Sequence, residues 1–156
     1  MQLPVLAYGR SIGACCAVHA ASHRPDLVKA VIVESGLQTI KRLPMIEQFV
    51  KRIPGGSQML SAASEPVRTS HELVELSQPV LFVHGDRDEL VPIQHAVTAH
   101  DECQSTWKKL HVVPGAGHND LHRHCGDTYW ELVSEVLETT HLLLNTGHVQ
   151  PMQEML

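Results

Sequence analysis

The sequence predicts an α/β fold in which a parallel β-sheet is flanked by helices. Four apolar segments of strand length alternate with segments of helical character, and the strands are expected at residues 3–8, 28–34, 79–84 and 109–113. Such alternation is typical of a parallel sheet with right-handed crossovers. Residues 80–83 are apolar without interruption, which favours a strand that helices cover on both faces. The 156 residues, 43% of them hydrophobic, are enough for one buried core.

The first strand ends in a turn that carries a serine between two glycines. Gly9, Ser11 and Gly13 stand two residues apart, before a helix of small residues expected at 11–23. A serine at such a strand-to-helix turn, called a nucleophile elbow, is a candidate nucleophile because its hydroxyl is exposed at the end of the sheet. We expect neighbouring backbone to approach both glycines too closely for any side chain.

The second strand leads into a segment, residues 36–76, that we expect to be either a cap over the site or an irregular insertion. One helical face in it is apolar and is bordered by basic residues: Met45, Ile46, Phe49, Val50 and Ile53, with Lys41, Arg42, Lys51 and Arg52. One interpretation is a lid that covers an acyl chain and makes peripheral contact with an anionic membrane. The other, which is the commoner case and the one we favour, is an amphipathic helix packed on the core.

The third and fourth strands each end in a loop with candidate catalytic groups. Asp86 and Asp88 follow the third strand, before a helix expected at 92–102, and His118 follows the fourth, before a helix expected at 127–144. The carboxyl ends of parallel strands lie at one edge of a sheet, so the serine, acid and histidine are expected to meet there. Their order along the chain, serine, aspartate, histidine, is the order of α/β-hydrolases.

In these motifs the sequence resembles the α/β-hydrolase superfamily, over residues 2 to about 144. Residues 84–92 are similar to its acid-loop motif, histidine-glycine-x-x-aspartate-x-x-valine-proline, which implies that Asp88 rather than Asp86 is the acid. Residues 114–121 are similar to its histidine loop, which implies that His118 is the base. The residues of both the elbow and the histidine loop are similar to those of small serine hydrolases, among them bacterial esterases and protein depalmitoylating thioesterases.

The resemblance implies a serine hydrolase that cleaves carboxylic esters or thioesters, of small molecules or of acylated proteins. Ser11 would attack the carbonyl, His118 would take and return the proton, and Asp88 would orient the imidazole. The backbone N–H of Ile12 would hold the oxyanion. This chemistry requires no cofactor.

The superfamily has several strands before the elbow strand, whereas this sequence begins with that strand. We therefore expect a truncated α/β-hydrolase domain over residues 1–144 that lacks the amino-terminal strands and the second oxyanion donor, with impaired activity. An unpaired first strand predicts self-association through its exposed edge. The alternative function is a non-catalytic interaction module or inactive fragment. A disordered tail is expected at 145–156.

Composition bears on which partners, location and metal sites are expected. A formal charge of −5 argues against a nucleic-acid surface. No run approaches the ~20 apolar residues of a membrane span. Four cysteines without paired spacing predict buried thiols in a reducing compartment, so we expect a cytoplasmic location. The cluster His118, His122, His124 and Cys125 lacks the spacing of zinc motifs, and no metal is expected there.

Three polar residues near the site are expected to have structural roles, and two of them have an alternative interpretation. Arg10, beside the candidate nucleophile, is expected to form a structural ion pair; the alternative is that it orients a substrate carboxylate or phosphate. Glu34, at the end of the second strand, is interpreted as a capping or pocket-wall residue, with an auxiliary acid as the alternative. Asp120 is expected to cap the helix after the histidine loop.

Overall fold

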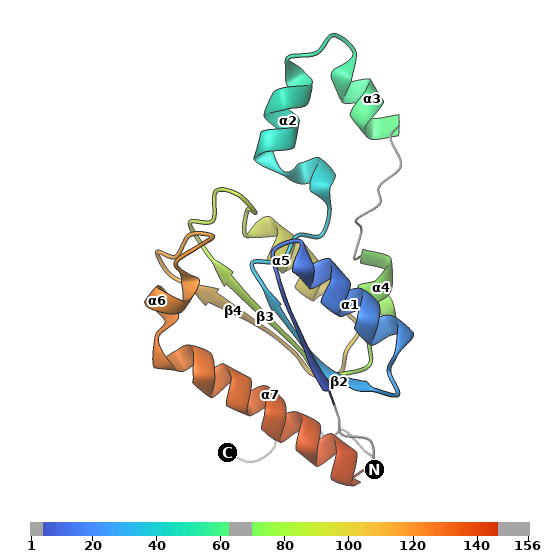
Figure 1. The fold of residues 1–156 in the computed structure, drawn as a ribbon, viewed down its shortest axis with the longest axis vertical. Coiled ribbons are helices and arrows are strands. Elements are labelled where there is room, and N and C mark those ends of the chain that lie inside the picture. Colours follow the sequence, from blue (N-terminus) through green and yellow to red (C-terminus); the bar gives the residue numbers. More distant parts are fainter. Residues whose placement is uncertain (1–4, 63–69, 147–156) are drawn as a thin grey trace.

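A computed structural model describes residues 5–62 and 70–146 of the chain. Four parallel strands form one sheet in the order β1-β2-β3-β4 (Figure 1). Their bounds are β1 Val5–Arg10, β2 Val28–Glu34, β3 Val80–Gly85 and β4 Lys108–Val113. The predicted strands are confirmed to within two residues at each end, although residues 3 and 4 of the first lie outside the described residues.

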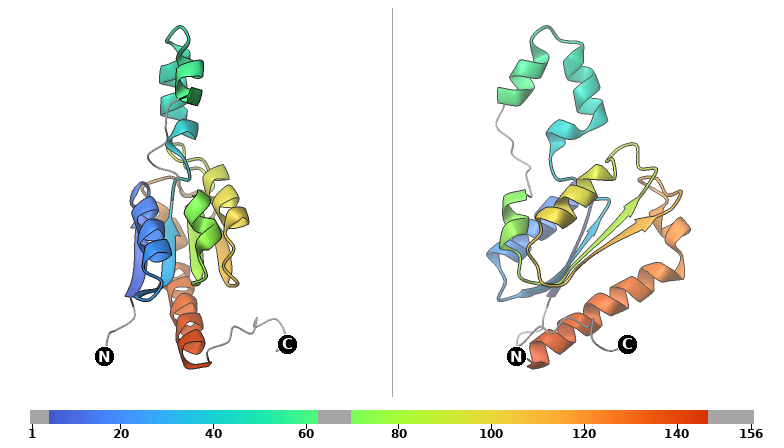
Figure 2. Two further views of the ribbon diagram at one scale, coloured as in Figure 1. Left: turned by 90° about the vertical axis from the view of Figure 1, so that its right-hand side faces the viewer. Right: turned by 180° about the vertical axis from the view of Figure 1, so that it is seen from behind.

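Helices cover both faces of the sheet (Figure 2). On one face lie α1 (Gly13–His23), α4 (Ser70–Glu75) and α5 (Gln94–Glu102). The other face is covered by α6 (Leu121–Cys125) and α7 (Asp127–Thr146). The predicted α/β class, a parallel sheet flanked by helices, is confirmed.

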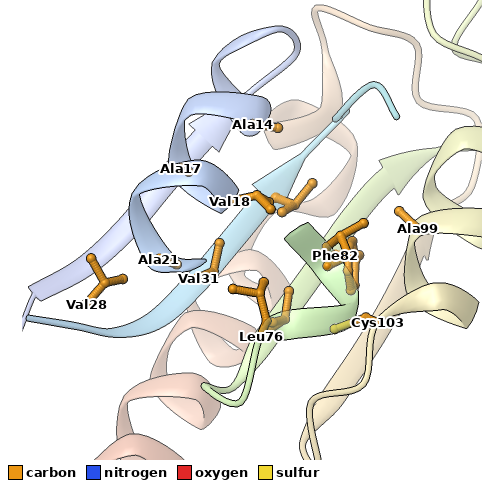
Figure 3. Close-up of a cluster of buried hydrophobic side chains, with 13 residues drawn as sticks. Ala14, Ala17, Val18, Ala21, Val28, Val31, Leu76, Phe82, Ala99 and Cys103 are labelled. Atoms are coloured by element: carbon orange, nitrogen blue, oxygen red, sulfur yellow. The ribbon is translucent and has the colours of Figure 1, made fainter. Parts of the chain in front are cut away.

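Successive residues of β2 and β3 belong to two separate cores, one on each face of the sheet, which explains why residues 30–33 and 80–83 are apolar without interruption. Val31 and Phe82 pack with Ala14, Val18 and Leu76 under α1, α4 and α5 (Figure 3). The residues next to them along the strands belong to the cluster under α6 and α7, which includes Ile32, Leu81, Val83, Leu132 and Val136. Side chains alternate between the faces of a strand, so a sheet covered on both sides needs apolar residues at every position.

The described part of the segment from 36 to 76, which leaves out residues 63–69, is largely helical. After β2 come a 3₁₀-helix, η1 (Ile40–Arg42), then α2 (Pro44–Lys51), α3 (Gly56–Ala62) and finally α4. Figures 1 and 2 show α2 and α3 lying against each other and projecting beyond the carboxyl ends of the strands. We call residues 40–62 the projecting hairpin.

The favoured interpretation, that α2 packs on the core, is wrong. No residue of α2 is buried, and the side chains of Met45 and Phe49 are 69% and 64% exposed. The helix contacts η1 and α3 instead of the sheet. Its apolar face is therefore available at the surface, on the same side of the molecule as the loops that follow the strands.

The cysteines differ in exposure, and the expectation that all four are buried is wrong. Cys103 and Cys125 are buried, Cys15 is half-buried and Cys16 is exposed, and all are free thiols. Consecutive helix residues point about 100° apart, so Cys15 and Cys16 cannot both face the core.

The carboxyl-terminal helix is longer than predicted. Residues 145 and 146, expected in the tail, continue α7, and residues 147–156 lie outside the described residues. Within residues 5–62 and 70–146, no helix combines the length and apolar character needed to cross a bilayer.

Candidate active site

The turn after β1 holds Ser11 in a backbone conformation that residues other than glycine rarely adopt. Its φ angle is +54°, in the left-handed region, and its N–H donates to the carbonyl oxygen of Glu34 at 2.9 Å. Strain of this kind costs on the order of 1–3 kcal/mol and persists only where surrounding structure imposes it. Here the imposed turn brings the hydroxyl of Ser11 to the carboxyl edge of the sheet.

The two elbow glycines are not equivalent. A Cβ built on Gly9 would lie 2.4 Å from the carbonyl oxygen of Gly13 and 2.6 Å from the Cα of Ala14, so α1 can follow β1 closely only if residue 9 is glycine. A Cβ on Gly13 would meet nothing within 4 Å. The steric prediction for Gly13 is wrong, because the space around its Cβ position, in the first residue of α1, is open.

His118 contacts both of the other predicted catalytic side chains. In the tautomer protonated on Nδ1, the imidazole donates to Oδ2 of Asp88 at 2.7 Å. Its Nε2 then accepts the hydroxyl proton of Ser11, with the two heavy atoms 3.1 Å apart. The structure thus brings Ser11, His118 and Asp88 together from the carboxyl ends of β1, β4 and β3, as the parallel topology predicts.

The acid loop after β3 holds Asp88 rigidly. The side chain of Asp88 is fully buried, and its Oδ1 accepts the N–H groups of Leu90 at 3.0 Å and Val91 at 2.8 Å. Two backbone donors on one oxygen leave the other oxygen directed at His118. The acid is therefore fixed in place by its own loop before any substrate binds.

A second imidazole, that of His84, lies beside the same carboxylate. His84 is 1% exposed; its Nε2 is 2.8 Å from the carbonyl oxygen of Val91, to which it donates, and 3.5 Å from Oδ2 of Asp88. Burial lowers the pKa of His84, and this effect outweighs the attraction of the Asp88 charge. A neutral His84 anchors the acid loop through Val91, a role that the sequence motif did not reveal.

Two further carboxylates shape the histidine loop. Oδ1 of Asp86 accepts the N–H of Gly115, and Oδ1 of Asp120 accepts the N–H of Gly117, each at 2.7 Å. The side chain of Asp86 therefore binds the loop backbone and leaves the His118 contact to Asp88. Asp120 occupies the N-cap position of α6, as predicted, but makes no side-chain capping bond there.

Glu34 is the buried centre of a polar network under the site. Its side chain has no exposed area, and Oε2 accepts the hydroxyls of Tyr8 and Tyr129, each at 2.9 Å. Nε2 of His122 lies 3.0 Å from the same oxygen. Burial, followed by the hydrogen bond to Glu34, raises the pKa of Tyr8 to about 12. Sequence reasoning identified Glu34 but missed the tyrosines; Tyr8 and Arg10, two residues apart, share a strand face, which was the available signal.

Arg10 connects this network to the histidine loop. Its Nε lies 3.2 Å from Oε1 of Glu34, which agrees with the predicted structural ion pair. The same guanidinium donates to the main-chain carbonyl of His118 and to Oδ1 of Asn119, the latter at 2.9 Å. Arg10 therefore holds the backbone of the residue that bridges Ser11 and Asp88.

Ile12, the predicted oxyanion residue, follows Ser11 at the start of α1. It is the N-cap residue of α1, with helical dihedral angles, and its side chain is 59% exposed. The first N–H groups of a helix have no partner within the helix and carry its positive dipole end. This end of α1 is beside Ser11.

The other histidine-loop residues considered as metal ligands point to different partners. His122 faces Glu34, and Nδ1 of His124 lies 3.0 Å from the carbonyl oxygen of Asp120. Cys125, the last residue of α6, is buried in the core between that helix and the sheet. His118 is bonded to Asp88. The four groups do not converge on one point.

A cavity of about 280 Å³ lies between the base of the projecting hairpin and the start of α5. It is lined by Gln38, Arg42, Pro44, Glu47, Pro92, Gln94 and His95. None of Ser11, Asp88 and His118 lines it, so it lies beside the candidate site without containing it.

The sequence of this chain is similar to the sequences of known proteins. The sequence profile of the prolyl oligopeptidase family matches residues 4–138. Protein bem46 of Schizosaccharomyces pombe is 31% identical over 136 residues, which are 85% of this chain and 43% of that protein. The α/β-hydrolase domain-containing protein WAV2 of Arabidopsis thaliana is 30% identical over 146 residues, 86% of this chain and 46% of that protein. The chain thus spans less than half the length of these relatives.

Solved structures share the arrangement of strands and helices. A monoacylglycerol lipase of Paleococcus ferrophilus superposes with a TM-score of 0.64 at 16% identity, over 88% of this chain and 69% of that one. At this level of identity the similarity concerns the fold.

Proposed function

The chain belongs to the prolyl oligopeptidase family of the α/β-hydrolase superfamily, and from this we propose that it is a serine hydrolase cleaving carboxylic esters or thioesters. The observation that carries the proposal is the pair of contacts made by His118, to Ser11 at 3.1 Å and to Asp88 at 2.7 Å. A solvent-accessible serine, an imidazole and a buried carboxylate in line are the groups needed for acyl transfer.

The proposed reaction proceeds through an acyl-enzyme. As Oγ of Ser11 attacks the carbonyl carbon, its proton passes to Nε2 of His118, and the new imidazolium is stabilised by Asp88. The proton then moves to the departing alkoxide or thiolate, which leaves the acyl group on Ser11. Water, deprotonated by His118, attacks this ester and releases the carboxylic acid and the free serine.

The tetrahedral intermediates carry a negative oxygen, and the N–H of Ile12 is the proposed donor for it. Its position at the amino end of α1 adds the favourable field of the helix. Loss of one such donor from a serine hydrolase costs on the order of 3 kcal/mol of transition-state stabilisation.

The projecting hairpin favours an acyl substrate and peripheral contact with anionic lipid. Met45, Phe49 and Met59 are 64–69% exposed on it, and Lys51 and Arg52 beside them are exposed cations. Apolar side chains rimmed by cations suit the boundary of a negatively charged membrane. We expect Phe49→Ser to reduce co-sedimentation with vesicles containing phosphatidylserine, and Leu137→Ser, exposed on α7, to leave it unchanged; equal binding of all three proteins contradicts the lipid contact.

A fluorophosphonate probe tests the nucleophile directly. Ser11 should be labelled, and Ser11→Ala should remove the label. Ser35→Ala is the matched control, because Ser35 also has a positive φ, of 44°, at the end of the neighbouring strand, but its hydroxyl is buried without a hydrogen-bond partner. A folded chain that takes no label, or that is labelled equally after Ser11→Ala, contradicts the proposal.

Substrate class is tested by comparing leaving groups. Initial rates should be measured with matched acyl esters, acyl thioesters and a proline-containing peptide, since the family takes its name from prolyl oligopeptidases. The proposal requires ester or thioester cleavage at least as fast as peptide cleavage, and dependence of each rate on Ser11. Cleavage of the peptide alone would contradict the substrate class but not the nucleophile.

The alternative is a non-catalytic module that associates through β1. Among the described residues β1 is an edge strand paired only with β2, and Val5 and Tyr8 on it are 41% and 49% exposed. An open apolar edge is a template for another strand. Sedimentation analysis decides: concentration-dependent dimers without probe labelling favour the module, and a labelled monomer favours the enzyme.

A further inference from the structure

Three side chains that could bind a metal meet on the side of the molecule opposite α7. His19 and His23 lie on α1, and Glu72 lies on α4, about fifty residues further along the chain. One potential ligand atom from each falls within 4.8 Å of the other two. Both histidines are exposed and Glu72 is half-buried, so ions in solution can reach the cluster.

The two histidines are spaced for chelation. Residues four apart on a helix project from the same side, one turn above the other. The rings of His19 and His23 have centroids 4.0 Å apart and are tilted by 36°. Two imidazoles held one turn apart on a helix are a recurrent pair of zinc ligands.

His23 is already held by the type of contact that supports a metal ligand. Its Nδ1 lies 3.0 Å from the carbonyl oxygen of His19 and 2.9 Å from Oγ of Ser22. A ligating histidine usually donates its second ring N–H to a carbonyl or carboxylate, which fixes the tautomer. Donation from Nδ1 to the His19 carbonyl leaves the lone pair of Nε2 on His23 free to bind an ion.

Glu72 supplies the anionic ligand. Its Oε1 lies 2.6 Å from Nδ1 of His19, with side-chain exposures of 21% and 60%. Ligands of one tetrahedral zinc ion are about 3.4 Å apart, given bond lengths of ~2.1 Å. A small rotation of these surface side chains therefore admits an ion between groups that now share a proton.

We propose that His19, His23 and Glu72 form a binding site for a divalent first-row cation, with Zn²⁺ as the best-matched ion. The bound ion would link α1 to α4. Two neutral imidazoles and a carboxylate are ligands that zinc accepts, with water in the fourth position. The two helices already pack through Val18 and Leu73. The ion bridges the helix that starts beside Ser11 and the helix that follows the projecting hairpin, so it stabilises the connection between them.

Calorimetric titration of the full chain with ZnCl₂, after treatment with a chelator, tests the site. Wild type should bind one ion that His23→Ala and Glu72→Gln weaken at least about tenfold, because even supporting residues of metal sites change affinity by that factor. Zinc should also raise the unfolding temperature of the wild type, and His23→Ala should abolish that rise.

Matched controls come from α4 itself. His71 and Glu75 form another exposed histidine–glutamate pair, 3.8 Å apart, and among the described residues this pair is not part of a group of three metal-binding side chains. His71→Ala and Glu75→Gln should leave zinc affinity and the thermal shift unchanged. Circular dichroism without zinc should be the same for all variants, because the substituted side chains lie at the surface.

Three results overturn the proposal. Absence of binding at millimolar zinc leaves His19 and Glu72 as a surface ion pair of little energetic value. Undiminished binding by His23→Ala places the ion at another of the chain's histidines. Equal weakening by His71→Ala removes the link between affinity and this cluster.

Discussion

Replacement of Arg10 by methionine should loosen the histidine loop while leaving the candidate triad residues in the chain. The substitution removes the guanidinium, and with it the ion pair with Glu34 and the hydrogen bonds to the His118 carbonyl and to Asn119. Methionine keeps much of the length and the apolar contacts of the arginine stem. The substitution therefore removes polar contacts at little cost in packing.

The size of the effect on stability follows from burial. Removal of one partner of a fully buried ion pair costs 3–5 kcal/mol, and exposed pairs contribute about 0–1 kcal/mol. Here the Glu34 side chain has no exposed area and that of Arg10 is 37% exposed. Glu34 keeps the hydroxyl donors of Tyr8 and Tyr129. We expect the free energy of unfolding to fall by about 2 kcal/mol, measured by urea denaturation.

The kinetic effect separates a positioning role from substrate binding. A displacement of catalytic groups by about 1 Å can lower turnover by ~10²-fold. We therefore expect Arg10→Met to lower kcat by ~10–100-fold with KM nearly unchanged, in an ester hydrolysis assay. If Arg10 instead binds a substrate anion, KM should rise with kcat nearly constant.

Arg10→Lys is the matched control. Its ammonium keeps a positive charge near Glu34 but cannot reproduce the planar set of donors that reaches the ion pair and the loop together. Stability should recover most of the loss, and kcat should remain low. Our account is refuted if Arg10→Met unfolds with the wild-type free energy, to within about 0.5 kcal/mol, and has the wild-type kcat.

Three further predictions concern the elbow and the acid loop. Gly9→Ala should destabilise by ~1–3 kcal/mol, because its Cβ would overlap Gly13 and Ala14, whereas Gly13→Ala should be neutral or stabilising; equal urea midpoints for the two variants would contradict the packing of α1 on β1. Asp88→Asn should lower kcat by ~10⁴-fold without unfolding the chain, because the amide favours the wrong imidazole tautomer, and a loss under tenfold would argue against the proposed acid. Burial lowers the pKa of His84 in the folded chain below the 6.5 of an unfolded histidine. At a pH between the folded and the unfolded pKa, the unfolded chain binds a proton that the folded chain excludes. Stability present above pH 6.5 should therefore fall as the pH falls through this window; His84→Gln should reduce the fall in urea denaturation between pH 7.5 and 5.5, and an unchanged slope would refute this.

The sequence alone determined the strands and the order of the candidate catalytic groups. Apolar runs are local signals, and a parallel sheet then requires Ser11, Asp88 and His118 to lie at one edge. The elbow serine is also local, since a strand, a tight turn and a helix succeed one another within a few residues. The choice of Asp88 over Asp86 came from the resemblance to the family's loop motif.

Only the tertiary structure decided how those loops are held and what surrounds them. The contacts of Glu34 with Tyr129 and of His19 with Glu72 join residues many positions apart, and depend on how α7 and α4 dock on the rest. The amphipathic pattern of α2 is the same whether its apolar face is covered or exposed, and its pairing with α3 left Phe49 at the surface. Sequence periodicity defines a face of a helix, but the surface that meets that face is set by the packing of the whole chain.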